Sequence, residues 1–199
     1  MKVFLFLYPI EQYFTSTSNA HVLRRIRQRG LSVSYLNDII HERYRKEKYQ
    51  VVWMLFGNLT DIRIPDRSSL SHYIHTQDGD IFVSSGVAYE GTAGHQPNPQ
   101  FVFSQLPSKI THLVLGGFHQ WDCVDKMGRF AYELGIPVIV DEDTTDHFLL
   151  AMSRFGKIPL VRPLHSAVDD VMKKNGLATR EMIVQQRSEK PWFAQPTVR

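Results

Sequence analysis

The stretch HLVLGGFHQWDCVDKMGRFAYELGIPVIVDEDTTDHF, residues 112–148, decides the fold. Its first apolar run, residues 112–115, ends at two glycines and predicts a buried strand. Residues 121–134 have the spacing of a helix, which Gly135 would end. The run IPVIV at residues 136–140 predicts a second buried strand. Strand, helix and strand in this order predict a parallel pair joined by a right-handed crossover.

An acidic segment follows the second of these strands. Residues 141–143 (DED) are expected to form a turn. Thr144 or Thr145 is then expected to cap a helix that runs to about Arg154, because a threonine hydroxyl can accept a hydrogen bond from the first free backbone N–H groups. The whole segment is therefore expected to be a βαβα unit.

The N-terminal half shows the same alternation of strands and helices. Continuous apolar runs predict buried strands, and segments with helical spacing predict helices. The strands are expected at residues 3–8 and 50–56, and the helices at residues 18–29 and 37–48. Residues 31–36 fit either a further strand or a link between the two helices.

The middle and the C-terminal end are less regular. Residues 59–80 are polar and predict a long excursion, a feature that often carries function in compact domains. A short strand is expected at residues 81–83 and a glycine-rich loop at residues 84–99. One or two helical turns are expected at residues 101–106, and two C-terminal helices at residues 165–174 and 179–185. Residues 1–186 are expected to form a single domain. Residues 187–199 are expected to form a tail or an interface arm, in which Trp192 and Phe193 contact either a partner or their own core.

Composition excludes several classes of protein. The chain has 199 residues, of which 43% are hydrophobic and 22% charged, and its net charge is +3. This length suits one compact domain, and so mild a charge does not require a nucleic-acid partner. The single cysteine, Cys123, excludes an intramolecular disulfide. The apolar N-terminus stops at Pro9 and is too short for a signal peptide or a membrane span. We therefore expect a cytoplasmic α/β protein with no membrane segment.

Cys123 is the candidate nucleophile. It lies just past a predicted strand end, where ligands bind in open α/β sheets. The first turn of a helix carries a partial positive charge that stabilises a thiolate, and its backbone N–H groups can hold an oxyanion. A lone cysteine is also often no more than a small buried hydrophobic residue. Position alone leaves both interpretations open.

The spacing around Cys123 resembles that of the isochorismatase-like cysteine hydrolases. In that family a strand and a glycine are followed, after five residues, by the catalytic Cys-Val pair, and a second glycine lies twelve residues beyond the cysteine. Gly117, Cys123, Val124 and Gly135 match this spacing. The IPVIV run and its acidic segment follow as in the family, and the resemblance covers residues 111–150.

The resemblance implies a fold and a chemistry. The fold would be a three-layer α/β/α arrangement with a mostly parallel, Rossmann-like sheet. Cys123 would attack the C–N bond of a small amide-like substrate, with no cofactor. A cis peptide bond would lie between Phe118 and His119, and the amides of His119 and Cys123 would form the oxyanion hole. Because members commonly form dimers or larger oligomers, a homo-oligomer is expected.

The general-base position departs from the family's pattern. The family has an aspartate at the end of its first strand, where this chain (FLYPIEQYF) has Tyr8 or Pro9. Glu11 is the nearest acid and is the candidate catalytic replacement, provided that the loop is reshaped. His95 and His119 are two further conceivable bases.

The family's lysine is also absent. It would fall at the end of the strand at residues 81–83, which leads here into two serines and a glycine. The pocket beside Cys123 is therefore expected to contain Tyr8, Ser85 and Trp121, although Trp121 would suit helix packing equally well. Without the usual base the thiol would stay protonated at neutral pH unless the helix terminus alone lowers its pKa.

No metal site is expected. The metal-binding members of the family place Asp and His two residues apart after the second strand, and this chain has no such pair there. That region contains Asp61, Asp66, His72 and His75. Two histidines without a third ligand are more often ordinary polar residues than a zinc site.

The first 50 residues are basic. Their cationic side chains are Arg24, Arg25, Arg27, Arg29, Arg43, Arg45, Lys46 and Lys48. Because Glu42 and Glu47 are mixed among them, a solvated helix face is favoured over a nucleic-acid surface. Three hypotheses follow: a cysteine hydrolase, a catalytically degenerate homologue that binds a small molecule or assembles, and, least favoured, a nucleic-acid-binding protein.

Overall fold

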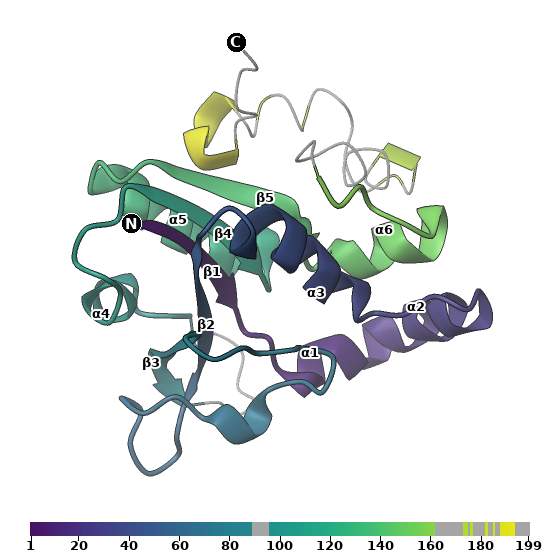
Figure 1. The fold of residues 1–199 in the computed structure, drawn as a ribbon, viewed down its shortest axis with the longest axis horizontal. Helices are drawn as coiled ribbons and strands as arrows, with labels where there is room; N and C mark the ends of the chain where they lie inside the picture. The colour runs from purple at the N-terminus through teal and green to yellow at the C-terminus, as the bar shows by residue number, and fades with distance from the viewer. Residues whose placement is uncertain are drawn as a thin grey trace.

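The computed structural model describes residues 1–88, 96–161, 173–174, 176, 182, 185 and 188–193. Within these residues a five-stranded sheet has the order β3-β2-β1-β4-β5 (Figure 1). Every strand pair in it is parallel. The strands are β1 (Lys2–Leu7), β2 (Gln50–Gly57), β3 (Ile81–Ala88), β4 (His112–Gly117) and β5 (Val138–Thr145). The α/β class predicted from the sequence is confirmed.

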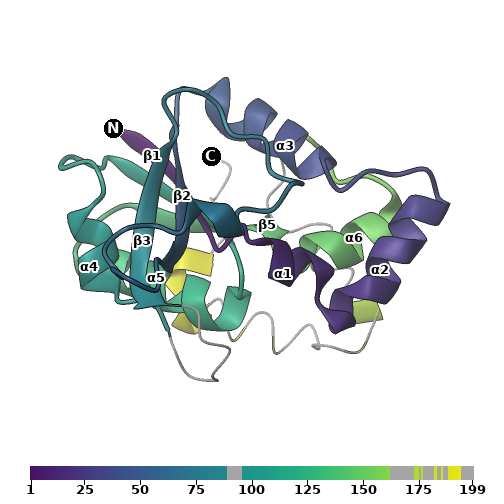
Figure 2. The ribbon, with the colours of Figure 1, turned by 90° about the horizontal axis from the view of Figure 1, so that it is seen from below.

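Helices cover both faces of the sheet. Figure 2 shows α4 and α5 on one side and α2, α3 and α6 on the other. The α-helices are α1 (Glu11–Thr15), α2 (Thr17–Gln28), α3 (Tyr35–Ile40), α4 (Pro99–Ser104), α5 (Asp125–Glu133) and α6 (Phe148–Phe155). The π-helical turn η1 (His41–Arg45) extends α3, and a second one, η3 (Gln120–Val124), precedes α5. The described residues also contain two short 3₁₀ turns, η2 (Arg67–Ser69) and η4 (Pro191–Phe193).

The core is built on the central strands. Residues 3–7 of β1 and residues 51–57 of β2 are all buried, as expected for strands covered on both faces. Phe6 contacts both Trp53 and Phe118, with ring centroids 5.8 and 6.3 Å apart. Burying each such side chain contributes on the order of 1.5–3 kcal/mol. The packing of these strands therefore fixes the position of their carboxyl ends, from which the loops of the candidate site emerge.

The prediction that β3 is a short strand followed by a loop was wrong. The strand runs through Ser84 and Ser85 to Ala88. The backbone N–H of Ser84 donates to Gln105 Oε1 at 3.0 Å, Gln105 Nε2 donates back to the Ser84 carbonyl at 2.8 Å, and the Ser84 hydroxyl donates to the Ile62 carbonyl. These distant partners satisfy polar groups that the sequence alone would place in solvent.

The acidic segment after the IPVIV run is also strand rather than turn. β5 continues through Asp141, Glu142 and Asp143 to Thr145, all buried. The predicted threonine cap was wrong as well, because α6 begins at Phe148 and its N-cap residue makes no side-chain cap hydrogen bond. The Thr145 hydroxyl instead donates to the Glu142 carbonyl at 2.7 Å.

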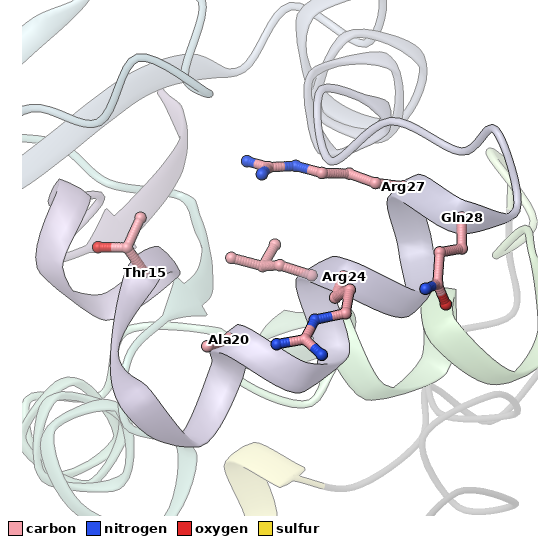
Figure 3. A pocket seen from close by; sticks show the side chains of 6 residues that line it. Thr15, Ala20, Arg24, Arg27 and Gln28 are labelled. Atoms are coloured by element: carbon pink, nitrogen blue, oxygen red, sulfur yellow. The ribbon is translucent and has the colours of Figure 1, made fainter.

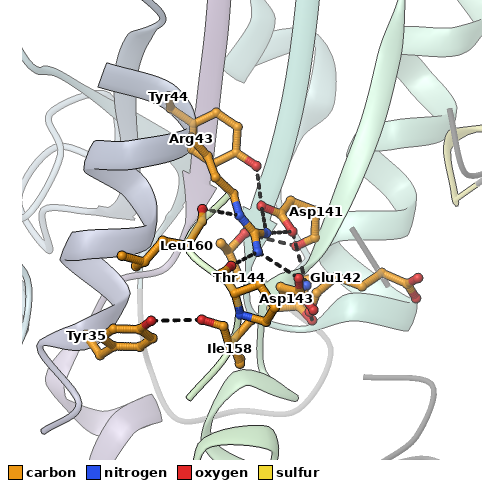
Figure 4. A network of polar contacts seen from close by, with 11 residues as sticks. Tyr35, Arg43, Tyr44, Asp141, Glu142, Asp143, Thr144, Ile158 and Leu160 are labelled. Carbon is orange, nitrogen blue, oxygen red and sulfur yellow. Dashed lines mark hydrogen bonds and ion pairs between the residues drawn. The ribbon is translucent and has the colours of Figure 1, made fainter. Parts of the chain in front are cut away.

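A buried ion network explains why this acidic strand can lie inside the protein. Arg43 donates to both oxygens of Asp141 and to Asp143, each at 2.9 Å, and Tyr44 donates to Asp141 (Figure 4). Arg43 also donates to the Leu160 carbonyl at 2.9 Å. One guanidinium thus joins η1 to β5 and to the chain that follows α6. Burial of the carboxylates is compensated by charge pairing and hydrogen bonds.

Other predicted elements differ in their bounds. The link interpretation of residues 31–36 is the correct one up to the start of α3 at Tyr35, and the helix predicted over residues 37–48 is α3 followed by η1. His95 and most of the two predicted C-terminal helices lie outside the described residues. No helix in the described part of the chain has the length and apolar character needed to cross a membrane.

The described part of the C-terminal segment packs on its own chain. Trp192 and Phe193 are buried. The indole N–H of Trp192 and the ammonium of Lys190 donate to the two oxygens of Asp125 at 2.8 and 2.7 Å. A Cβ on Gly128 would lie 2.5 Å from the Trp192 ring, so α5 needs glycine there to admit it.

Candidate active site

The candidate site lies where the strand order changes direction. β1 and β4 are neighbours, yet the helices that follow them lie on opposite faces, and such a switch point is where open α/β sheets bind ligands. Leu7 is paired with Gly117, and the Phe118 N–H donates to the Leu7 carbonyl at 3.0 Å. Gly117 has φ of +101°, and a Cβ there would lie 2.1 Å from the Leu7 carbonyl oxygen. Only glycine lets the two strand ends approach this closely.

Cys123 lies in η3, directly beyond β4, as the sequence predicted. It is 6% exposed, and its Sγ lies 4.0 Å from Asp122 Oδ2. Burial first, and then the charge of Asp122, raise the pKa of the thiol to about 11. The backbone N–H of His119 and the charge of Lys126 act in the opposite direction. Because the raising effects win, the thiol is protonated at neutral pH.

The peptide bond between Phe118 and His119 is cis, at the place that the resemblance implies. The carbonyl of His119 accepts hydrogen bonds from the N–H groups of Asp122 and Val124, at 3.2 and 3.0 Å. The N–H of the same residue faces Cys123. The turn thus presents a backbone donor to the sulfur, which favours the thiolate form.

The His119 side chain pairs with an acid that the sequence prediction missed. Its Nδ1 lies 3.8 Å from Asp146 Oδ2, and this partner raises the pKa of His119. Burial alone would raise the pKa of Asp146, but its pairing with His119, the charge of His147 and a hydrogen bond from the Gln120 N–H hold it below its ordinary value. The pair fastens the turn beside Cys123 to the end of β5. The sequence interpretation missed Asp146 because it placed this residue at the start of a helix, whereas β5 runs on to Thr145.

Tyr8 is one of the two residues, with Pro9, that the resemblance places where the family has its general base. It follows β1 with φ of +54°, is 1% exposed, and stacks on Phe56 with ring centroids 4.3 Å apart. Burial raises the pKa of the phenol strongly; Ser85 lowers it, and Cys123 and Asp122 raise it. The phenol is therefore neutral and cannot act as the family's carboxylate does.

Ser85 lies opposite Tyr8, where the resemblance places a lysine. It is fully buried in β3, and its hydroxyl donates to the Val87 carbonyl at 3.3 Å. It faces the Tyr8 phenol closely enough to lower its pKa. Even so, the Tyr8 hydroxyl has no partner among the described residues at hydrogen-bond distance and angle. Tyr8, Ser85 and Cys123 thus form a cluster of neutral polar groups, one of which has an unused donor.

Glu11 points elsewhere. Its Oε2 accepts hydrogen bonds from the Ser71 hydroxyl at 2.7 Å and from the His72 N–H at 3.1 Å, and it lies 2.8 Å from His72 Nδ1. The groups that set the pKa of Cys123 do not include it. Glu11 also lines a separate cavity of about 370 Å³ with Phe56 and other residues. The structure therefore gives Glu11 a part in fastening the excursion after β2 and does not bring it to the thiol.

Trp121 packs against the C-terminal segment. Its ring centroid is 4.7 Å from that of Phe193, and the Lys190 ammonium lies 5.9 Å from the centroid. Of the two interpretations left open by the sequence, this geometry supports packing. In the described residues, no group of three or more His, Cys, Asp or Glu lies close enough together to hold a metal ion.

Comparisons with known proteins give likeness in structure only. No family model matches the chain, and no curated protein matches it. Among solved structures, the chain is similar to N-carbamoylsarcosine amidase from Thermoplasma acidophilum, with 17% identity, a TM-score of 0.47, and 90% of this chain and 95% of that chain covered. It is also similar to nicotinamidase PncA from Bacillus subtilis, with 14% identity, a TM-score of 0.42, and coverage of 76% and 93%.

A third similar structure is an isochorismatase-like hydrolase from Alkaliphilus metalliredigens, with 12% identity, a TM-score of 0.46, and coverage of 85% and 99%. All three identities are below 25% and all three TM-scores are below 0.5. The chemistry of this chain has to be inferred from its own residues.

Proposed function

We propose that this chain is an isochorismatase-like protein that binds a small neutral molecule at the Cys123 site and does not hydrolyse it. The observation that carries the proposal is the neutral cluster of Tyr8, Ser85 and Cys123. A cysteine hydrolase needs a thiolate or a base that generates one. Here the thiol has a pKa raised to about 11, and the group at the base position is a neutral phenol.

The same cluster supports binding. A buried hydroxyl without a partner costs free energy, which a ligand acceptor would recover. The Tyr8 hydroxyl is such a donor, and the His119 N–H, which faces the Cys123 sulfur, is a backbone donor of the same site. A small amide or other carbonyl compound offers the acceptor that these donors require. The acidic neighbour Asp122 disfavours an anionic ligand.

The test uses isothermal titration with nicotinamide and pyrazinamide, together with an assay of ammonia release. We expect binding without ammonia release in the wild type. Tyr8→Phe, which removes only the hydroxyl, should weaken binding about tenfold, because it removes the donor to the ligand. Cys123→Ala should leave binding within a few-fold. Ammonia release that depends on Cys123 would contradict the proposal, and so would equal binding by the Tyr8→Phe variant.

A second candidate is an active cysteine hydrolase, and one observation favours it. Cys123 lies in the first turns of a helical segment that begins at Gln120, and a backbone N–H faces its sulfur, which favours a thiolate. His119 would then have to act as the base, although its pairing with Asp146 raises its pKa and favours the protonated form. Ammonia release that is lost in both Cys123→Ala and His119→Gln would identify this function.

Self-association is also proposed. Leu59, Ile62 and Ile64 are exposed apolar side chains on the excursion after β2, and exposed apolar groups that lie near one another often mark interfaces. We expect sedimentation to show a homo-oligomer. Ile62→Asp should shift it toward monomer if this segment contributes to the interface.

A further inference from the structure

A pocket lies on α2, apart from the cluster around Cys123. Its volume is about 380 Å³, which is within the range of small-ligand sites. One residue from the end of α1 and five from α2 line it: Thr15, Ala20, Leu23, Arg24, Arg27 and Gln28. The α2 residues are spaced three, four, seven and eight positions apart, so they share one face of the helix. None of the six belongs to the Cys123 site.

The charged side chains that line this pocket are all cationic. Two guanidinium groups line it, and no carboxylate does. Figure 3 shows the side chains of Arg24 and Arg27 extending on either side of the space, with Thr15 across from them. Arg27 Nη2 donates to the Tyr73 hydroxyl at 2.7 Å, which orients its head group while its other donors stay available. Arg24 makes no hydrogen bond or ion pair with the described part of the chain.

Two arginines further along the chain differ in this respect. Arg43 is paired with Asp141 and Asp143, and Arg45 makes two hydrogen bonds to Asp80 at 2.6 and 2.8 Å. Their charges are already compensated inside the fold. Among the described residues no acid pairs with Arg24 or Arg27, so their charges remain available for an anion from solution.

We propose that this pocket binds a phosphate-bearing small molecule. Guanidinium forks match phosphate oxygens in pairs, and two of them suit a dianion. The Gln28 amide supplies a further donor at the edge, whereas the Thr15 hydroxyl already donates to the Glu11 carbonyl at 2.9 Å. Leu23, which is buried, and Ala20 offer an apolar surface for the rest of the ligand. The limited volume favours a small molecule over a nucleic-acid strand.

The test is isothermal titration with AMP, with adenosine as its neutral counterpart and inorganic phosphate as the minimal anion. Arg25→Gln is the matched control, because Arg25 lies on the same helix but does not line the pocket. We expect AMP and phosphate to bind the wild type and the control equally. Arg24→Gln and Arg27→Gln should each weaken AMP binding about tenfold or more, through the loss of a charge-assisted hydrogen bond. Adenosine should bind poorly.

Several results would overturn the proposal. If Arg25→Gln weakened AMP binding equally, AMP binding would depend only on the overall charge of α2. Tighter binding of a single-stranded oligonucleotide with the same dependence on Arg25 would indicate a nucleic-acid surface instead. Absence of AMP and phosphate binding to the wild type would exclude the site. Arg27→Lys keeps the charge but not the fork, so it should still weaken AMP binding, and thermal unfolding verifies that each variant is folded.

Discussion

Two buried polar clusters, one around Arg43 and one around Cys123, differ in how their charges are matched. In the first, a guanidinium lies between Asp141 and Asp143, and the two carboxylates hold the pKa of Arg43 above its ordinary value although burial alone would lower it. In the second, burial and a neighbouring acid both act against ionisation of the thiol. The first cluster is charged and structural, whereas the second is neutral. Partner charge, and not burial alone, decides which groups ionise inside this fold.

The largest effect is expected from breaking the charged cluster. Arg43→Met leaves Asp141 and Asp143 buried without their cation, which should cost about 3–5 kcal/mol of unfolding free energy. Urea denaturation followed by circular dichroism measures it. Lys46→Met is the control, because the Lys46–Glu42 pair lies at the surface of the same segment and should contribute about 0.5 kcal/mol or less. Equal effects of the two substitutions would show that the Arg43 network is not structural.

The second prediction concerns the close backbone contact between β1 and β4 beside the neutral cluster. Gly117→Ala places a Cβ against the Leu7 backbone at positive φ and should cost about 2–4 kcal/mol. Gly30→Ala has a similar backbone problem with φ of +68°, but a Cβ there meets nothing within 4 Å. It should cost only about 1–2 kcal/mol. Urea midpoints that coincide would contradict the close approach of β1 and β4.

The third prediction is a loss of stability in alkali. The folded thiol has a pKa of about 11, above the ordinary 9.0, so the unfolded chain loses its proton first as pH rises. The contribution is therefore complete below about pH 9 and is lost between pH 9 and pH 11. Over this interval the wild type should lose about 2–3 kcal/mol more unfolding free energy than Cys123→Ala. Parallel pH profiles of the two proteins would contradict a raised thiol pKa.

The smallest effect should come from one acidic neighbour. Asp122→Asn removes a charge that raises the pKa of Cys123, so alkylation by iodoacetamide at pH 8 should become about two- to fivefold faster. Glu133→Gln removes an equal charge from the exposed face of α5 and should leave the rate unchanged. An unchanged rate in Asp122→Asn would show that burial alone sets the thiol pKa.

Much of the fold could be predicted from the sequence because its signals are local. The apolar runs that form β1, β2 and β4 are buried on both faces and need no distant partner to be recognised. The ends of β3 and β5 could not be predicted in this way. Ser84 and Asp141 are polar, and they belong to strands only because Gln105 and Arg43 satisfy them from far along the chain.

The candidate site was predicted in part for the same reason. The spacing around Cys123 is local, and the structure places Cys123 and the cis peptide bond where that spacing implies them. Sequence spacing alone could not identify the residue that lies beside the Cys123 thiol. Positive φ at Tyr8 turns the chain after β1, which leaves the phenol near Cys123 and takes Glu11 to Ser71 and His72.

The most direct test of the account is the ionisation of Cys123 itself. Because the chain has a single cysteine, protein labelled with ¹³C at cysteine Cβ gives one resonance whose shift follows the thiol through a pH titration, without any need for reagent access. A titration midpoint near pH 11 is predicted, well above the ordinary thiol value. A midpoint below about pH 7.5 would mean an activated nucleophile, and it would contradict the proposal that this site binds without hydrolysing.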